Sequence, residues 1–437
     1  MTQLTYAKID KTVLATLSPP ERNYWITVAL LFGGVLIGAG CWVYQILMGI
    51  GVGGQNNPVH WGTYLINFVF WVGIAHSGTL ISAILHLFRA GWRNPIARAA
   101  ETMTVFAVCT AGLFPFIHLG RVWMVYYMLP IPNQRTLWPN FQSPLMFDVV
   151  AISTYLIVSS LFWYTGMLPD LAIVRNNASG IRRKIFAILS LGWTGAYENW
   201  RHYTRGYLFF AALATPLVIS VHSVVSWDFA LGVIPGWHTT IFAPYFVAGA
   251  IHSGLAMVLT LMIPLRKAFG YEDIISLNVL ENVAKTIVFT GLIVGFAYGT
   301  EVFIAWYSHN SVEMETFYWR AFGDYSKEYW IMVLCNVLMP LSLLFKKMRT
   351  NIKSLFIISI FVNIGMWYER FVIIIGSVGH DFLPHAWGLY APTAIEYGIM
   401  IGSFCLFFFL FVLFVKHLPS VSMTEMKETV ITGDQHV

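Results

Sequence analysis

The stretch WGTYLINFVFWVGIAHSGTLISAILHLF, residues 61–88, contains no aspartate, glutamate, lysine or arginine. It is longer than the roughly 20 mainly apolar residues that an α-helix needs to cross a bilayer. Comparable apolar runs recur along all 437 residues, of which 57% are hydrophobic and 11% are charged. A soluble domain carries about 25% charged residues, so this chain has too few to cover a surface in water. The sequence therefore predicts an all-α polytopic membrane protein.

Ten membrane spans are predicted from these runs. Their expected bounds are 24–50, 61–88, 99–128, 145–168, 205–227, 240–265, 279–307, 329–345, 355–378 and 392–415. The longest polar connection, 169–204, is expected to hold a short surface helix. No cleavable signal peptide is expected, because the first apolar run starts near Trp25 and is longer than the core of a signal peptide.

An internal repeat links the second span to the sixth. The segment GIAHSGTL, residues 73–80, reappears as GAIHSGLA, residues 249–256, and each copy is followed by a glutamate, Glu101 or Glu281. The repeat covers four spans, and an even number of spans returns the chain to the same side, so the two copies run parallel. This predicts two tandem parallel four-helix bundles with two peripheral helices. The expected divisions are 1–58 (N-terminal segment and span 1), 59–235 (first bundle), 236–385 (second bundle) and 386–437 (span 10 and tail).

Basic residues gather in the loops on one side of the predicted membrane, at 89–98, 175–184, 266–270 and 346–353. The opposite loops, such as 308–317 and 379–387, are poor in lysine and arginine. By the positive-inside rule, the basic loops and both termini are expected in the cytoplasm. Five tryptophans gather near the other face, as interfacial anchors do: Trp123, Trp138, Trp227, Trp237 and Trp306.

The cysteines and histidines indicate which redox cofactors the chain could hold. Cys41, Cys109, Cys335 and Cys405 lie far apart and form no Cys-x-x-Cys motif, so no iron–sulfur cluster or covalent haem is expected. One span carries two histidines ten residues apart, on different helix faces, which disfavours haem b. A haem between His118 and His222 stays an alternative, and no other metal is expected. The net charge of +5 is explained by the basic loops and requires no nucleic acid.

Ionisable residues cluster in the outer half of the first predicted bundle, where they are costly and usually functional. They come from spans 3, 4 and 5 at one expected depth. A carboxylate beside an imidazole can accept the two protons that a quinol sheds on oxidation. The alternative is an ion-pair network that only fixes helix packing. We assign His118, Asp148 and Asp228 as catalytic residues, and Arg121, His222, Trp123 and Tyr126 as quinol-binding residues.

Other buried polar residues are candidates for a proton path. The histidines of the two His-Ser-Gly motifs are expected near mid-membrane, where the adjacent serines and glycines suit close helix packing. Glu101 and Glu281, at the cytoplasmic ends of spans 3 and 7, fit either proton entry or interfacial ion pairs. The candidates are His76, His252, Glu101, Glu281, Lys285, Glu301, Glu369 and Arg370.

Two phrases, NFVFWVGIAHSGTLISAILHLFRAGWRNPIARAAE from residue 67 and FPFIHLGR…SPLMFDVVAISTYL from residue 114, closely resemble NrfD-type membrane subunits. Within that family the chain is most similar to the quinol-oxidising, ActC-like subunits of bacterial alternative complex III. The resemblance covers all ten predicted spans. It implies a menaquinol or ubiquinol site on the periplasmic side of the first bundle, with His118 and Asp148 matching the family's site residues. Asp228 and His222 match its third-helix acidic position less closely.

The resemblance also implies partners, because this chain carries no ligands for a redox centre of its own. The expected partners are a periplasmic iron–sulfur subunit, haem c subunits, a second NrfD-type membrane subunit, a terminal oxidase and membrane lipids. Four alternatives stay open at this point. They are the ActF-like sister subunit, the membrane subunit of a polysulfide or nitrite reductase, a proton-conducting transporter, and a scaffold for soluble redox subunits.

Overall fold

The computed structural model describes residues 5–129, 131–132, 136–138, 141, 143–237 and 239–431. In these residues it contains helices and no strand, and ten helices are long and apolar enough to cross a membrane, which confirms the predicted all-α polytopic fold. Residues 432–437 of the predicted tail lie outside the described part. The ten spans run over Arg22–Met48, Gly62–Leu87, Gly91–His118, Pro144–Asn177, Tyr197–Ala230, Phe242–Ala268, Leu277–Tyr307, Ser326–Leu344, Ile352–Val378 and Ala394–His417.

The spans are of two kinds, single helices and spans built from more than one helical segment. Seven spans are single helices: α2 (Arg22–Met48), α7 (Pro144–Asn177), α9 (Tyr197–Ala230), α10 (Phe242–Ala268), α11 (Leu277–Tyr307), α16 (Ile352–Val378) and α17 (Ala394–His417). The composite spans are α3 (Gly62–Thr79) with η2 (Leu80–Ile84) and α4 (Leu85–Leu87); η3 (Gly91–Arg93) with α5 (Asn94–Ala111) and α6 (Leu113–His118); and α13 (Ser326–Val333) with η6 (Leu334–Leu338), α14 (Met339–Leu341) and η7 (Ser342–Leu344).

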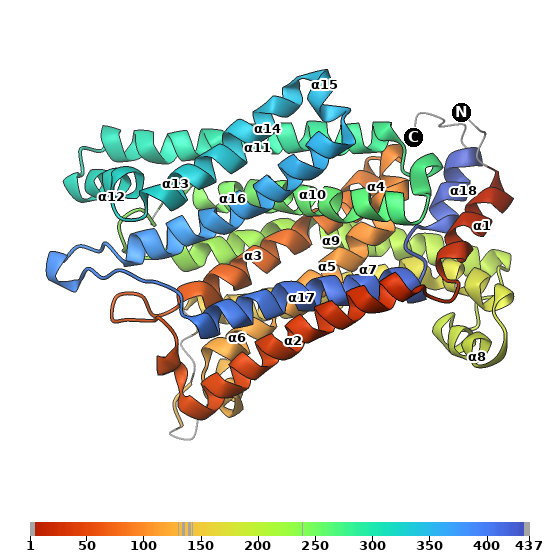
Figure 1. Ribbon diagram of the computed structural model, residues 1–437, viewed down its shortest axis with the longest axis horizontal. Coiled ribbons are helices and arrows are strands. Elements are labelled where there is room, and N and C mark those ends of the chain that lie inside the picture. Colours follow the sequence, from red (N-terminus) through yellow and green to blue (C-terminus); the bar gives the residue numbers. More distant parts are fainter. Residues whose placement is uncertain are drawn as a thin grey trace.

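Shorter helices lie at the two ends of the spans. They are α1 (Tyr6–Thr16), η1 (Ile50–Val52), η4 (Val122–Met128), α8 (Gly180–Leu189), η5 (Tyr271–Asp273), α12 (Ser311–Phe322), α15 (Lys346–Arg349), η8 (Pro384–Ala386) and α18 (Met423–Ile431). Figure 1 shows both chain ends at one end of the molecule, together with α1, α8 and α18. We call this the terminal end, and we call the opposite end, which carries α6 and α12, the distal end.

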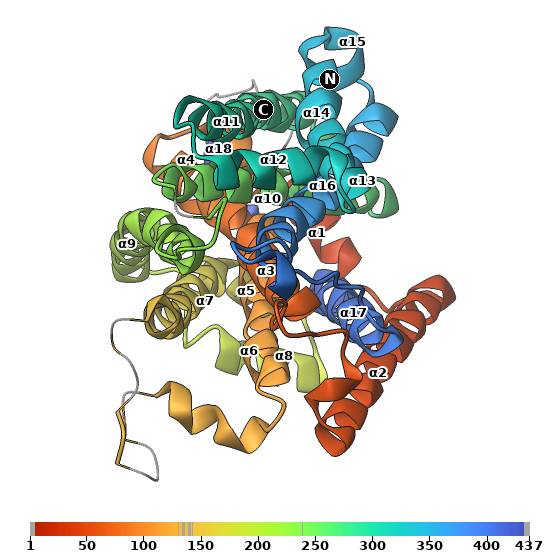
Figure 2. The ribbon, with the colours of Figure 1, turned by 90° about the vertical axis from the view of Figure 1, so that its left-hand side faces the viewer.

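The centre of the fold is formed by α3 and α10, the helices that carry the two His-Ser-Gly motifs. Figure 2, viewed from the distal end, shows α3, α10 and α16 in the middle, α7 and α9 on one side and α2 with α17 on another. The close approach expected at the motifs is present, because a side chain at Gly254 would clash with Ser77 Oγ and one at Gly73 would lie 3.5 Å from Ser253 Oγ. Small residues at these positions let the two helices pack tightly.

The third span differs from its expected form. Its helix was predicted to run over 99–128, but it ends at His118, and the chain then turns into the 3₁₀ segment η4. Gly120 adopts φ +64°, a left-handed conformation that ends helices and that glycine tolerates best. The predicted surface helix in 169–204 is present as α8, although α7 continues past Pro169 to Asn177 before it.

Candidate functional site

His118, the last residue of α6, lies against two aromatic residues at the start of the second span. Its ring stacks on Trp61, with 4.2 Å between ring centroids and 11° between planes, and the Tyr64 ring meets it at 6.5 Å. The His118 Nδ1 atom is buried and has no hydrogen-bond partner among the described residues. The imidazole is therefore positioned by packing, and a ring nitrogen stays available for a proton or a ligand.

Gln45 connects the first span to the His118 helix. Its amide donates to the Ile117 carbonyl at 2.8 Å, and its side-chain oxygen accepts a hydrogen bond from the Tyr64 hydroxyl. Gln45 is fully buried, although α2 otherwise exposes most of its apolar surface. A further contact is made by Ile50, since a side chain at Gly120 would lie 3.4 Å from its Cβ. The outer helix α2 thus holds the end of α6 in place.

We expect the substitution Gln45→Leu to loosen this end of α6. It leaves the Tyr64 hydroxyl and the Ile117 carbonyl without their buried partner, a loss of about 1–3 kcal/mol. Thermal unfolding of the purified protein should shift to lower temperature, and hydrogen exchange should rise at the amides of α6. Thr27→Ala, at an exposed position of the same helix, is the matched control. Unchanged exchange in α6 would show that Gln45 does not hold this helix.

Asp148 and Asp228 form a pair of facing carboxyl groups. Asp148 lies just inside the start of α7 and Asp228 just before the end of α9, and these antiparallel neighbours bring both to the distal end. The two carboxyl groups are close enough to share a hydrogen bond when one of them is protonated. No donor among the described residues reaches any of their four oxygen atoms, all of which are buried. Neither carboxyl group has an arginine partner in the described structure. The ion-pair network that the sequence left open as an alternative is therefore not seen at these two residues.

His222 lies deeper, against His76 rather than beside the aspartates. The two rings are 4.4 Å apart, and Tyr155 stacks on His76 at 5.2 Å. His76 Nδ1 lies 2.5 Å from the Val72 carbonyl oxygen, but its Nε2 and both nitrogens of His222 have no partner among the described residues. Both imidazoles are buried. These predicted site residues therefore fall into three polar groups, at His118, at the aspartate pair and at the histidine pair.

Arg121, Trp123 and Tyr126 lie beyond the end of the helix that was expected to contain them. Arg121 is exposed at the turn after Gly120, and the exposed Trp123 and the half-buried Tyr126 lie in η4. The structure places them at the distal end, beside His118 in the chain, and does not place Arg121 in an ion pair with a described carboxylate. Their predicted part in quinol binding stays a prediction.

A second buried cluster joins α16 to α11 and η6. Glu369 pairs with Arg370 and accepts a hydrogen bond from the Tyr298 hydroxyl, which also accepts one from Asn336 at 2.9 Å. The Arg370 guanidinium lies 4.9 Å from the centroid of the Phe246 ring. This cluster lies on the bundle axis, because α16 packs on both α3 and α10.

Glu301 lines a small cavity on the distal side of that cluster. The cavity has a volume of about 20 Å³, enough for one water molecule. It is also lined by Tyr245, Tyr298 and Arg320, which belong to α10, α11 and α12. Glu301 Oε1 and the Tyr245 hydroxyl have no protein partner in the described residues.

Glu101 is enclosed in a buried ion-pair network at the terminal end. Arg98 pairs with Glu101 at 2.9 Å and with Asp170 at 3.2 Å, and the Tyr207 hydroxyl donates to Glu101 at 2.8 Å. All three charged side chains are almost fully buried. Proton entry and an ion pair were the two alternatives for Glu101, and the contacts of Glu101 in the structure are those of an ion pair.

The C-terminal helix α18 closes this network. Asp170 accepts hydrogen bonds from the backbone and the hydroxyl of Thr424, and Arg93 pairs with Glu425 at 2.7 Å. Burial alone would raise the pKa of Glu425, but the Arg93 guanidinium, helped by Arg98, holds that pKa below its ordinary value. The charge of Glu425 therefore helps to hold α18 on the spans.

Acidification should release α18. A carboxyl group whose pKa is lower in the folded state stabilises it above the unfolded pKa, and this contribution is lost as the pH falls through the folded pKa. Protection of the α18 amides against hydrogen exchange should fall below about pH 4.5, after correction for the intrinsic rate. Glu425→Gln should remove the pH dependence and leave exchange fast throughout. Equal protection of the native helix at about pH 6.5 and pH 3.5 would contradict this account.

The remaining proton-path candidates lie nearer the terminal end or at mid-span. Glu281 pairs with Arg349 at 2.9 Å and with Lys285 at 3.4 Å. His252 Nδ1 lies 3.0 Å from the Thr290 hydroxyl, and its Nε2 has no partner among the described residues.

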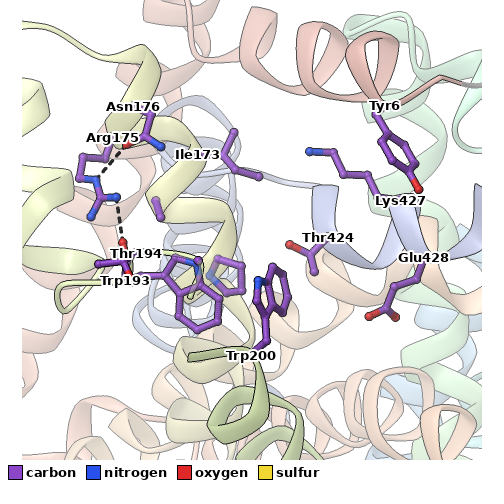
Figure 3. Close-up of a pocket in the computed structure, with 13 residues that line it drawn as sticks. Tyr6, Ile173, Arg175, Asn176, Trp193, Thr194, Trp200, Thr424, Lys427 and Glu428 are labelled. Atoms are coloured by element: carbon purple, nitrogen blue, oxygen red, sulfur yellow. Dashed lines mark hydrogen bonds between the residues drawn. The ribbon is translucent and has the colours of Figure 1, made fainter. Parts of the chain in front are cut away.

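A larger pocket, of about 500 Å³, opens at the terminal end between α1, α7, α9 and α18. Figure 3 shows Trp193 and Trp200 on one side of it and Tyr6 and Lys427 on the other. Its basic groups are engaged: Arg175 donates to the Trp193 carbonyl at 2.8 Å, and Lys427 pairs with an aspartate of α1. None of the predicted quinol-site residues lines this pocket.

Sequence reasoning missed residues that position the site. Gln45 was detectable as a lone amide in the apolar run 24–50, and Trp61 and Tyr64 were read only as part of a span. Asp170 was assigned to the polar connection 169–204, because span 4 was expected to end at residue 168. Among the described residues, no group of three or more histidine, cysteine, aspartate or glutamate side chains is arranged to hold a metal ion.

The fold and these sites define a multi-pass helical membrane protein with acid–base groups buried inside its bundle. Residues 51–379 match the family described as polysulphide reductase, NrfD, and the chain belongs to this family. The match covers most of the chain, from η1 to the end of the ninth span.

One relative has a more particular name. A Halobacterium salinarum protein, named as the membrane component of a "Putative dimethyl sulfoxide reductase", is 30% identical to this chain over 257 residues. The matched region is 58% of this chain and 54% of the relative, so the chain spans about half the length of that protein.

Proposed function

We propose that this protein is the membrane subunit of a respiratory quinol oxidoreductase of the alternative complex III type. It would bind menaquinol or ubiquinol at the distal end of α6, α7 and α9 and remove its two protons and two electrons. The observation that carries this proposal is the Asp148–Asp228 pair, whose four buried oxygens have no donor in the described protein. Two facing carboxyl groups repel each other when both are ionised, and one added proton removes that repulsion. The pair is thus suited to accept a proton from a hydroxyl group.

His118 supplies a second acid–base group in the proposal. Its imidazole stacks on Trp61, and its buried Nδ1 is free of protein partners in the described structure. A quinol hydroxyl that reaches this nitrogen can donate its proton there, while the flat Trp61 and Tyr64 rings offer apolar surface for the quinol ring. Arg121, Trp123 and Tyr126 would then line the entrance from the lipid.

The orientation of the site follows from the distribution of charge. The basic helices α8 and α15 and the basic end of α10 lie at the terminal end. By the positive-inside rule we propose that this end and both termini face the cytoplasm and that the distal end faces the periplasm. Protons taken from quinol at the distal end would therefore be released on the periplasmic side of a bacterial inner membrane.

The electrons need acceptors outside this chain. We propose that they pass to a periplasmic iron–sulfur subunit and then to haem c subunits, and that a second NrfD-type subunit and a terminal oxidase complete the assembly. The buried groups along the bundle axis, from Glu101 through His76 to Glu369 and Glu301, are the candidates for proton translocation coupled to this reaction. His252, Glu281, Lys285 and Arg370 are the remaining members of that set.

A second candidate function is favoured by the name of the relative. The protein named there is the membrane component of a dimethyl sulfoxide reductase. The site described here would serve such a complex if quinol electrons passed to a terminal reductase instead of to haem c. Isolation of the native complex and identification of its redox subunits by mass spectrometry distinguish the two.

Equilibrium binding of a fluorescent quinol-analogue inhibitor tests the proposed site. We expect Asp148→Asn to weaken binding at least tenfold in the purified complex, because asparagine keeps the size of the side chain but removes its capacity to accept a proton. Asp324→Asn, at an exposed distal position between α12 and α13, is the matched control and should bind as the native protein does. Native affinity in a correctly assembled Asp148→Asn complex would show that the carboxyl pair is structural.

A further inference from the structure

The surface helix α8 is fixed to the protein by one of its faces. Phe186 is buried, the Arg182 guanidinium donates to the Leu17 carbonyl at 2.7 Å, and the Tyr164 hydroxyl donates to the Leu189 carbonyl at 2.7 Å. Arg182, Phe186 and Leu189 follow the i, i+4, i+7 spacing of a single helix face. The orientation of α8 is therefore set by contacts with α1 and α7.

A second face of α8 is apolar and uncovered. Ile181, Ile185 and Ile188 are 77%, 50% and 75% exposed, and they repeat the same i, i+4, i+7 spacing. At 100° per residue they project within about 60° of one another, and roughly 100° from the docked face. Leu191, just after the helix, adds to this surface with 69% exposure and φ +45°. A leucine rarely adopts that conformation, which costs about 1–2 kcal/mol.

The third face of α8 is basic. Arg183 and Lys184 are exposed and have no carboxylate partner in the described part of the chain. At 100° per residue, their mean direction lies roughly 120–140° from the docked face and from the apolar face. A helix with one docked, one apolar and one basic face has the composition of a segment that lies in the membrane interface.

We propose that α8 is an interfacial helix that enters the lipid with its Ile181–Ile185–Ile188 face and binds anionic phospholipid headgroups with Arg183 and Lys184. The location supports lipid as the occupant. Figure 1 places α8 on the outer side of the molecule, at the end of α7, and α7, the span that α8 packs against, itself exposes Ile157 and Leu161. The apolar face thus continues the surface that the spans present to the bilayer.

Charge complementarity supports the second half of the proposal. Two adjacent basic residues beside an apolar face, with no carboxylate partner in the described chain, suit a phosphate group at the level of the lipid headgroups. The proposal is independent of quinol oxidation, since it rests on α8 alone. Its failure would leave the proposed redox function untouched.

Spin-label accessibility tests the insertion of α8. The four cysteines are replaced by alanine, and a single spin-labelled cysteine is placed at Ile188 or, as the matched control, at Lys184. The full chain is reconstituted in phosphatidylcholine vesicles with about 30% phosphatidylglycerol. We expect the label at position 188 to be accessible to oxygen and shielded from a water-soluble nickel complex, and the label at position 184 to show the reverse. Equal nickel accessibility at both positions would overturn the proposal.

A second measurement tests headgroup binding. Binding of short-chain phosphatidylglycerol to the detergent-purified chain is followed by native mass spectrometry. The double variant Arg183→Gln, Lys184→Gln should bind at least tenfold more weakly, whereas Lys346→Gln, Lys347→Gln in the exposed α15 should bind as the native chain does. Native binding by the α8 variant would overturn the assignment of the headgroup site. Phosphatidylcholine, whose zwitterionic headgroup has no net charge, serves as the comparison and should bind equally to all three proteins.

Discussion

Quinol turnover should fall by about 10²–10⁴-fold when Asp148 is replaced with asparagine, the range lost with a positioned acid or base. Asp228→Asn should cause a loss of similar size, because the two carboxyl groups act as one proton-accepting unit. The double variant should be little worse than either single variant, as residues that act together have non-additive effects. Steady-state oxidation of a soluble quinol by the purified complex is the measurement, with Asp324→Asn as the control.

The pattern of losses also separates the proposed role from a structural one. If the pair fixed the packing of α7 on α9, the single variants would lose stability, whereas a pair kept for proton transfer loses only its carboxyl repulsion, so its single variants gain stability. Thermal unfolding and turnover should therefore move in opposite directions in the asparagine variants. Native turnover in the double variant would place the proton acceptor elsewhere, with His118 the next candidate.

Arg98→Leu should lower the stability of the protein by about 3–5 kcal/mol, the usual cost of breaking a buried ion pair from one side. The change leaves Glu101 and Asp170 buried without the guanidinium that they share, and it removes the donor to the Gly166 carbonyl. Chemical unfolding in detergent, followed by circular dichroism, measures the loss. Arg205→Leu, at an exposed position near the start of α9, is the control and should change stability little.

A triple variant sharpens this test. Arg98→Leu combined with Glu101→Gln and Asp170→Asn removes all three charges, and replacing a complete buried ion network is often neutral. We expect it to recover much of the stability lost in Arg98→Leu. If the triple variant were as unstable as the single one, the loss would come from packing around the long arginine side chain.

The spans could be predicted from the sequence because their cause is local. A bilayer imposes one requirement on each segment, an apolar length of about 20 residues, and residues 61–88 satisfy it without reference to any other part of the chain. The exceptions have local causes as well. The left-handed Gly120 follows the third helix, which ends earlier than its apolar run suggested. The fourth helix, α7, continues through Pro169 to Asn177, beyond the expected end of its span.

The pairing of polar residues could not be predicted, because it depends on how helices rotate against one another. His222 and Asp228 are six residues apart on one helix, yet His222 faces His76 and Asp228 faces Asp148. Depth in the membrane could be estimated from the position along each span, and the sharing of one depth suggested one site. The directions in which the side chains of α9 point are set by its packing against α7, α10 and α3, which the sequence does not give.

The contact of α18 with the third span has a consequence for biosynthesis. Arg93 enters the membrane early in translation, but its carboxylate partner Glu425 lies 332 residues further along the chain. Until that late segment leaves the ribosome, the guanidinium has no ion-pair partner and relies on the Ser82 carbonyl and His86. The ion pair of Arg93 is therefore completed only when the last helix arrives, so a nascent chain interrupted before α18 keeps this arginine without its carboxylate partner.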